Sequence, residues 1–181
     1  MALPEPYILI VAGMPGAGKT TVSRLVADRL DRAAHLEADA LHRMIVSGGV
    51  WPDREMNDEQ RSQLALRGRN ICLLADSFAQ DGFSVIVDDV VIGARLAEFR
   101  AQIRHRPLGF VLLTPRPDVL RERNAGRESR DVVEAWQHLD AVMRTETPPV
   151  GLWIDSSEQS AVETAEQILE QAEHSALLEG G

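Results

Sequence analysis

Residues 7–30 read YILIVAGMPGAGKTTVSRLVADRL, and the organisation of the fold follows from this stretch. It opens with a continuous apolar run from Tyr7 to Ala12, which has the length and composition of a parallel strand covered on both faces. Beyond a glycine-rich turn, apolar residues recur at helical spacing, at Val22, Leu25, Val26 and Leu30. The stretch therefore predicts a buried strand, a tight loop and an amphipathic helix, in that order.

The turn matches the pattern G-x-x-x-x-G-K-[ST] in full, from Gly13 to Thr20, with a strand before it and a helix after it. Glycines let successive backbone N–H groups converge on phosphate oxygens, and the helix N-terminus attracts the same anion. We therefore predict a binding site for ATP, formed by Gly13, Met14, Pro15, Gly16, Ala17, Gly18, Lys19, Thr20 and Thr21. The alternative is a glycine-rich turn that only joins a strand to a helix.

Lys19 is the only lysine in the chain, and every other residue of the lysine and arginine count is an arginine. A compact ammonium fits between phosphates where a planar guanidinium does not, so Lys19 is a candidate catalytic residue that contacts the β- and γ-phosphates. The Thr20 hydroxyl is a candidate ligand of Mg²⁺. A GTPase of the type that reads its base with an N-K-x-D motif is excluded, because that motif needs a second lysine.

Four more segments of strand length follow, at residues 34–37, 84–87, 109–114 and 151–155. Segments with helical periodicity separate them, and Ser160 and Glu163 have capping-box spacing ahead of a last helix. Strands that alternate with helices over residues 1–181 predict a single α/β domain of three layers around a mostly parallel sheet.

Composition narrows the function classes. The net charge of −9 at pH 7 disfavours nucleic acid as a partner. Cys72 is the only cysteine, so no internal disulfide forms, and its apolar neighbours predict a buried structural thiol. The N-terminal apolar run is too short for a signal sequence or a membrane span. We expect a cytoplasmic protein without a membrane partner, and the oligomeric state stays open.

Asp88 and Asp89 directly follow the buried segment at residues 84–87. In open α/β sheets, ligands bind at the carboxyl ends of the strands, so a carboxylate there is suited to hold Mg²⁺ opposite Thr20. Adjacent residues of a strand point to opposite faces, so one of the pair faces the nucleotide, and we predict Asp88. The alternative is that these residues cap the next segment.

Asp39 closes the second predicted strand, which lies beside the first if the strand order is the usual one. A phosphoryl acceptor needs a carboxylate that orients its hydroxyl and takes its proton, and Asp39 is the candidate catalytic base. The alternative is that Asp39 is the N-cap of the following helix. His42 lies one turn further on and is predicted to be a surface histidine.

Arginines are concentrated in residues 116–131, at Arg116, Arg121, Arg123, Arg127 and Arg130. We predict that this segment is a lid over the nucleotide, in which Arg123, Arg127 and Arg130 contact ATP and Arg127 is catalytic. Guanidinium groups stabilise charge on a transferring phosphoryl group and stack on adenine. The alternative is a solvated face paired with Glu122, Glu128 and Asp131.

With these residues the chain resembles the chloramphenicol phosphotransferase-like family of small P-loop kinases. The resemblance rests on Gly13–Thr20, on Asp39 followed by Ala40 and Leu41, on VIVDDVVIG at residues 85–93, and on the arginine-bearing lid. It implies a five-stranded parallel sheet in the order 2-3-1-4-5 between helices. It also implies ATP-dependent phosphorylation of a small-molecule hydroxyl, with Asp39 as general base. The segment between Asp39 and Leu64 does not match closely, so the acceptor stays open.

The sequence therefore predicts a Mg·ATP-dependent kinase whose partner is a small hydroxyl-bearing molecule, either antibiotic-like or a metabolite. Two alternatives remain. The first is a kinase of nucleosides, nucleotides or polynucleotide 5′ ends, and the second is an ATP-binding or ATP-hydrolysing module that is not a kinase.

Overall fold

The computed structural model describes residues 6–53, 55–125, 131–172 and 176–178, and only the backbone of residues 131–137. The strands are β1 (Ile8–Gly13), β2 (Ala33–Glu37), β3 (Ser84–Asp88), β4 (Leu108–Leu113) and β5 (Leu152–Ile154). The helices are α1 (Lys19–Ala27), α2 (Ala38–His42), α3 (Asp58–Gln80), α4 (Ala94–Gln102), α5 (Pro117–Asn124), α6 (Asp131–Thr145) and α7 (Ala161–Gln171). None of the helices in these residues is long and apolar enough to cross a membrane.

The strands form a five-stranded parallel sheet in the order β2-β3-β1-β4-β5, as the family resemblance implied. Every residue of β1, β3 and β4 is buried, whereas β2 is mostly half-buried. Strands that are apolar on both faces need helices on both sides of the sheet. Strand β3 lies between β1 and β2 and pairs with both. The expectation that the second strand lies beside the first was therefore wrong.

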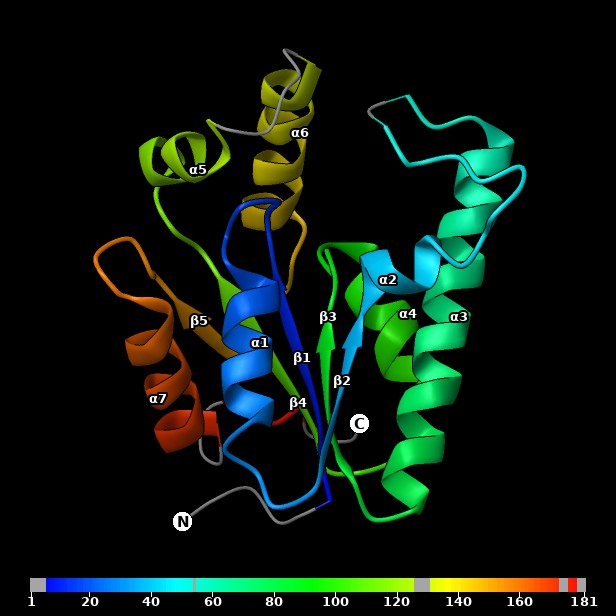
Figure 1. Cartoon of the computed structure of the whole chain (residues 1–181). Helices are drawn as coiled ribbons and strands as arrows, with labels where there is room; N and C mark the ends of the chain where they lie inside the picture. The colour runs from blue at the N-terminus through cyan, green and yellow to red at the C-terminus, as the bar shows by residue number, and fades with distance from the viewer. Residues whose placement is uncertain (1–5, 54, 126–130, 173–175, 179–181) are drawn as a thin grey trace.

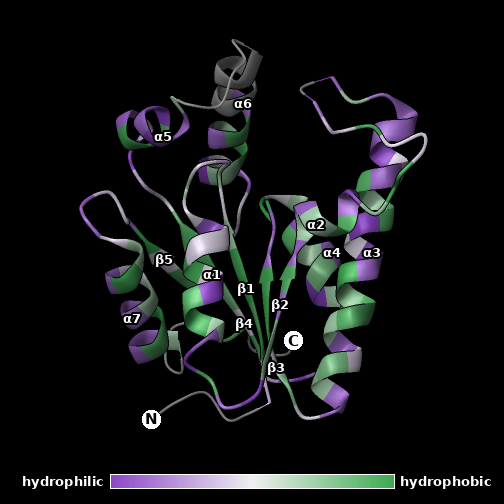
Figure 2. Ribbon diagram, viewed as in Figure 1, coloured by the Kyte–Doolittle hydropathy of each residue, from purple (hydrophilic) through white to green (hydrophobic). Residues whose placement is uncertain are grey.

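Helices cover both faces of the sheet (Figure 1). Helices α1 and α7 pack side by side on one face, and α3 and α4 lie on the other. Helices α5 and α6 stand above the carboxyl ends of the strands. The hydrophobic colouring of the central strands in Figure 2 marks the core, which the aromatic rings of Phe99 and Phe110 help to fill.

Capping boxes begin two of the helices. In α3, the backbone N–H of Gln60 donates to Asn57 Oδ1 over 2.9 Å, and the N–H of Asn57 donates to Gln60 Oε1 over 2.8 Å. Ser160 and Glu163 form the same arrangement at α7, as their spacing predicted. Each box pairs backbone donors that a helix start leaves without partners.

Cys72 lies on the buried face of α3. Burial raises the pKa of this thiol to about 12, with the nearby Asp76 carboxylate as the second cause. The prediction of a buried cysteine is confirmed, and a thiol that stays protonated is a poor nucleophile.

Candidate active site

The predicted phosphate loop joins β1 to α1 through residues 14–18, at the carboxyl edge of the sheet. Gly16 and Gly18 both have left-handed backbone conformations, with φ of 83° and 90°. A Cβ on Gly18 would meet nothing within 4 Å, so only the conformation requires glycine there. A Cβ on Gly16 would lie 1.6 Å from Asn124 Nδ2, so this position also requires the missing side chain.

The loop carries the side chains that the motif predicts. Lys19 is the first residue of α1, and its Nζ donates to the carbonyl of Met14 over 3.1 Å. Thr20 is exposed at the N-terminus of the same helix. Met14 and Ala17 are buried, so two apolar side chains hold the loop against the core while its polar groups stay at the surface.

Helix α5 packs directly onto the loop through Asn124, a residue that the sequence analysis missed. Its Nδ2 donates to the carbonyls of Leu120 and Pro15, over 2.8 Å and 3.3 Å. Beside it, Arg123 Nη2 donates to the carbonyl of Ser156 over 3.0 Å. No sequence pattern singles out one asparagine in this arginine-rich segment. Its contact with the phosphate loop becomes visible only when α5 is packed against the loop.

A pocket of about 300 Å³ lies beside the loop, between α1, α5 and the start of α7. Its lining includes Gly18, Thr21, Arg123, Ser156, Gln159 and Thr164. A pocket next to a phosphate loop, with apolar side chains and an arginine in its wall, is suited to the base and sugar of a nucleotide. The nucleotide-binding roles of these residues stay predictions.

Two of the other predicted lid residues, Arg127 and Arg130, lie outside the described residues. Arg116 forms an ion pair with Glu158 over 2.6 Å, and this hydrogen bond raises the pKa of the Arg116 guanidinium. Arg116 therefore belongs to a solvated face, although its partners are Glu158 and Asp118 rather than the acids expected from the sequence.

The two aspartates that follow β3 lie on opposite sides of the sheet. Asp88 Oδ2 lies 3.5 Å from His35 Nε2, and His35 lines a pocket together with residues of α1. Asp88 therefore lies on the face of the sheet that α1 covers, which is also the face of Thr20. Asp89 is on the side of α3 and α4. There it accepts from Arg67 Nη2 over 2.8 Å and from Arg95 Nη2 over 2.9 Å.

This division matches the requirements of a Mg²⁺ site. Both oxygens of Asp89 are bonded to arginines, whereas the buried Asp88 Oδ2 has no hydrogen-bond partner among the described residues. The described residues also hold no group of three or more His, Cys, Asp or Glu side chains that could bind a metal by themselves. Mg²⁺ commonly takes one or two protein ligands and completes its shell with phosphates and water, so Thr20 and Asp88 fit this ion.

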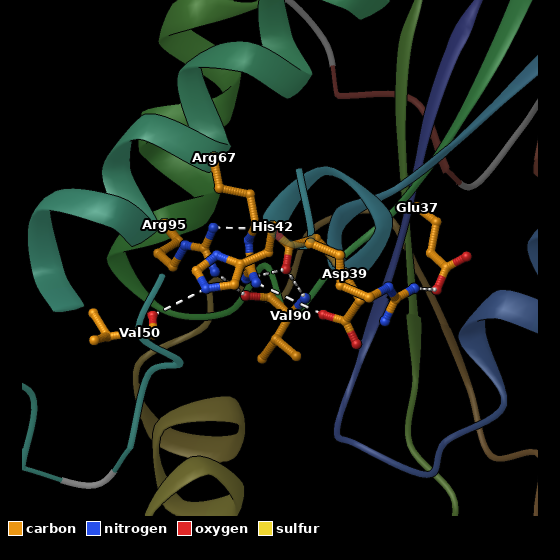
Figure 3. Close-up of polar contacts among 9 residues, drawn as sticks. Glu37, Asp39, His42, Val50, Arg67, Val90 and Arg95 are labelled. Atoms are coloured by element: carbon orange, nitrogen blue, oxygen red, sulfur yellow. Dashed lines mark hydrogen bonds and ion pairs between the residues drawn. The ribbon is translucent and has the colours of Figure 1, made fainter. Parts of the chain in front are cut away.

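Asp39 lies in the first turn of α2 and neither closes β2 nor caps the helix (Figure 3). Strand β2 ends at Glu37, where the chain turns directly into α2, so Glu37 occupies the N-cap position. The N-cap alternative for Asp39 was therefore wrong. The Asp39 side chain is 58% exposed, and its Oδ1 lies 3.7 Å from Arg67 Nη1.

The register of the sheet shows how these residues meet. Glu37 is paired with Asp88, and Asp88 with Val11, in one row across β2, β3 and β1. Asp39, Asp88 and the phosphate loop therefore leave neighbouring strands at the same edge of the sheet.

His42 is buried at 3% exposure, which corrects the expectation of a surface histidine. Its Nε2 is within 2.9 Å of the carbonyl of Val50, and its ring lies 4.3 Å from the ring of Trp51. The cause is Gln63 of α3, which binds the N–H of Val50 and the carbonyl of Gly48. Gly48 and Val50 are therefore held against α3, and Val50 and Trp51 cover His42.

Arg67 and Arg95 are the other residues that the sequence analysis missed. Arg67 follows Leu64 by three residues and precedes Ile71 by four, so it occupies the buried face of α3. An arginine on an apolar helix face was the available signal, since a buried charge requires a partner.

The structure is similar to solved structures of small kinases. A sugar kinase from Janibacter sp. has a TM-score of 0.64 at 22% sequence identity, over 92% of this chain and 94% of that chain. For shikimate kinase from Acinetobacter baumannii the TM-score is 0.61 at 22% identity, over 92% of both chains. For the tunicamycin resistance protein of Deinococcus radiodurans it is 0.66 at 19% identity, over 98% of this chain and 100% of that chain. These likenesses show the fold, which is the α/β fold of P-loop kinases.

A comparison with curated proteins finds no match. The family described as AAA domain matches residues 8–148, from the first residue of β1 to beyond the end of α6. This range is most of the chain and includes the phosphate loop, Asp39, Asp88 and Arg123. The chain belongs to the AAA domain family.

Proposed function

We propose that this protein is a Mg·ATP-dependent kinase that transfers the γ-phosphate of ATP to a hydroxyl group of a small molecule. One observation carries the proposal. An exposed carboxylate, Asp39, lies at the same edge of the sheet as the phosphate loop, one strand away from the buried Asp88. A nucleotide-binding module alone needs the loop but has no use for a carboxylate that is open to a second substrate.

The transfer follows from these positions. The acceptor oxygen attacks the γ-phosphorus, a new O–P bond forms, and the bond to the β–γ bridging oxygen breaks, so that ADP leaves. The proton of the acceptor hydroxyl passes to the Asp39 carboxylate. Lys19 and the loop amides hold the phosphates in line for this attack. Phosphoryl transfer depends mainly on positioning and charge, so both halves of the site contribute.

Thr20 and Asp88 would hold Mg²⁺, which neutralises charge on the phosphates when it is bound. Arg123 contributes to the pocket beside the loop, where it would contact the nucleotide. Arg127 and Arg130 are proposed to complete the lid, with Arg127 close to the transferring group.

The acceptor is proposed to be an antibiotic-like compound or a metabolite. Solved relatives of the same fold include kinases named for sugars and shikimate and a tunicamycin resistance protein. The sequence phrase VIVDDVVIG supports the closer resemblance to chloramphenicol phosphotransferase-like kinases. We propose that the reaction takes place in the cytoplasm, without a membrane or nucleic-acid partner.

ADP release tests this function. Purified protein is incubated with Mg·ATP and a panel of sugars, hydroxylated metabolites, nucleosides and antibiotics, and at least one compound is expected to stimulate ADP release. Asp39→Asn should lower the stimulated rate by about 10²–10⁴-fold. Glu37→Gln is the matched control, because Glu37 lies at the same edge but is paired with Arg43. ATP binding without stimulation by any compound of the panel would contradict the kinase proposal.

A further inference from the structure

Arg67 connects two carboxylates that differ in exposure. Asp89 is 2% exposed and Asp39 is 58% exposed, and the 5% exposed guanidinium of Arg67 contacts both. We propose that Arg67 is a positioning residue, which orients the Asp39 carboxylate for the acceptor hydroxyl and is itself anchored by Asp89. This inference rests on the proposed function of Asp39 as the base.

The anchor side of this arrangement is rigid. Arg67 Nη2 donates to Asp89 Oδ1 over 2.8 Å, and Asp89 Oδ1 also accepts the backbone N–H of Val90 over 2.7 Å. Arg95 holds the second oxygen of Asp89 over 2.9 Å and donates to the carbonyl of Val90 over 2.9 Å. Asp89 is thus bound through both oxygens and is unable to rotate without losing several hydrogen bonds.

The planar geometry of arginine passes this rigidity on to Asp39. The nitrogens of a guanidinium have fixed directions, so the bond from Nη2 to Asp89 determines where Nη1 points. Nη1 lies 3.7 Å from Asp39 Oδ1, an ion-pair distance that leaves the carboxylate free to adjust as a substrate binds. Figure 3 shows Arg67 and Asp39 approaching each other from α3 and α2. Within the described part of the chain, this ion pair is the one polar contact of the Asp39 side chain.

Charge balance supports a role beyond folding. Two arginines converge on the single buried carboxylate of Asp89, which leaves one positive charge in excess. The Arg67 Nε atom, moreover, has no hydrogen-bond partner in the described ranges, so the group is not fully satisfied where it lies. A buried ion pair of this kind is generally no more stabilising than apolar residues of similar volume. Asp39 supplies the missing negative charge, and it does so at the proposed site of chemistry.

Asp88 and Asp89 thereby acquire separate tasks on the two faces of the sheet. Asp88 faces α1 and the proposed metal, whereas Asp89 acts through Arg67 on the proposed base. Neighbouring carboxylates would in this way align the phosphate and acceptor halves of the site with each other.

A double-mutant cycle tests the inference. Arg67→Lys removes the fork that reaches both carboxylates and keeps the charge. ADP release from Mg·ATP is measured without an added acceptor, so that water takes the place of the hydroxyl, and again with any acceptor that the panel identifies. Arg67→Lys should lower kcat by about 10-fold or more and leave KM for ATP within about twofold. In a protein that already carries Asp39→Asn, Arg67→Lys should change kcat by less than about twofold, since the Asp39 carboxylate that Arg67 orients is then absent.

Asp76→Asn is the control, because Asp76 lies on the buried face of the same helix, accepts the backbone N–H groups of Arg104 and His105, and takes no part in the contacts of Arg67. It should lower the melting temperature and change kcat by less than about threefold. If Arg67→Lys does not fold, Asp89→Asn replaces it in the cycle, with a loss of kcat again expected only when Asp39 is present.

Three outcomes would overturn the inference. Equal losses of kcat with and without Asp39 would show that Arg67 acts on something other than the base. Equal losses of kcat in Arg67→Lys and Asp76→Asn would show a general structural effect. Wild-type protein that releases no ADP, either with water or with any panel compound, would overturn the proposed function together with this inference. The first two outcomes, by contrast, would leave the proposed function intact.

Discussion

The phosphate half and the acceptor half of the candidate site meet at one sheet edge, but they are assembled in different ways. The phosphate half is the contiguous run from β1 through residues 14–18 to α1. The acceptor half unites Asp39 of α2 with Arg67 of α3, Arg95 of α4 and the Asp89 that follows β3. Backbone conformation shapes the first, whereas ion pairs between separate elements shape the second.

This difference separates what each half contributes to the reaction. A loop that binds through its backbone accepts the same phosphate chain whatever the acceptor is, and it tolerates few substitutions at its glycines. Side chains on separate helices can be exchanged one by one, so they suit the part of the site that selects the acceptor. Substitutions should therefore affect the two halves independently, and the following predictions test that independence.

The largest effect is expected for Lys19→Ala in the phosphate half. Removing the only ammonium of the loop takes away a positive charge from the transferring phosphoryl group, and we expect kcat/KM to fall by about 10³-fold or more. The rate of stimulated ADP release measures this loss. Lys19→Arg is the control, because a planar guanidinium keeps the charge without the compact shape and should restore little. Recovery of most of the activity by Lys19→Arg would disprove the geometric argument.

An intermediate effect is expected for Gly16→Ala. The added Cβ would meet Asn124 Nδ2 at 1.6 Å, and the backbone would keep a φ of 83° that side chains rarely adopt. Left-handed conformations cost about 1–2 kcal/mol per residue, so we expect ATP affinity to fall by about 10-fold or more, measured by calorimetry with a non-hydrolysable ATP analogue.

The double variant Gly16→Ala/Asn124→Ala separates the two causes. Shortening Asn124 removes the clash but not the backbone strain, so affinity should recover in part. Full recovery would show that the φ of Gly16 contributes nothing, and no recovery would show that α5 moves away without cost.

The phosphate half could be predicted from the sequence because its determinants are local. The apolar run at residues 7–12, the glycines and Lys19 are contiguous, and each has a meaning that does not depend on distant residues. Strands β1, β3, β4 and β5 could be located for the same reason, since each has a continuous apolar core, whereas β2 contains His35 and Glu37 and gave a weaker signal. The strand order was predicted from the family resemblance, because apolar segments locate the strands but do not determine which of them are neighbours in the sheet.

The acceptor half was only partly predictable. Asp39 could be found from its place after β2, but its neighbours depend on helices that meet only in three dimensions. Arg67 and Arg95 converge on Asp89 from α3 and α4, and no spacing in the sequence relates the three. His42 was misplaced because residues 43–53 look like an open loop in the sequence, whereas Gln63 holds Gly48 and Val50 against α3, next to His42.

The smallest effect is expected for Gln63→Leu, which tests whether the attachment of Gly48 and Val50 to α3 affects the acceptor half alone. The substitution leaves the N–H of Val50 and the carbonyl of Gly48 without their side-chain partner, at a cost of about 1–3 kcal/mol. We expect a lower melting temperature, faster tryptic cleavage next to Arg43 and a higher KM for the acceptor. KM for ATP should stay unchanged. Gln80→Leu, at the exposed end of the same helix, should change none of these. A higher KM for ATP in Gln63→Leu would show that residues 43–53 also shape the phosphate half, and the two halves would then not be independent.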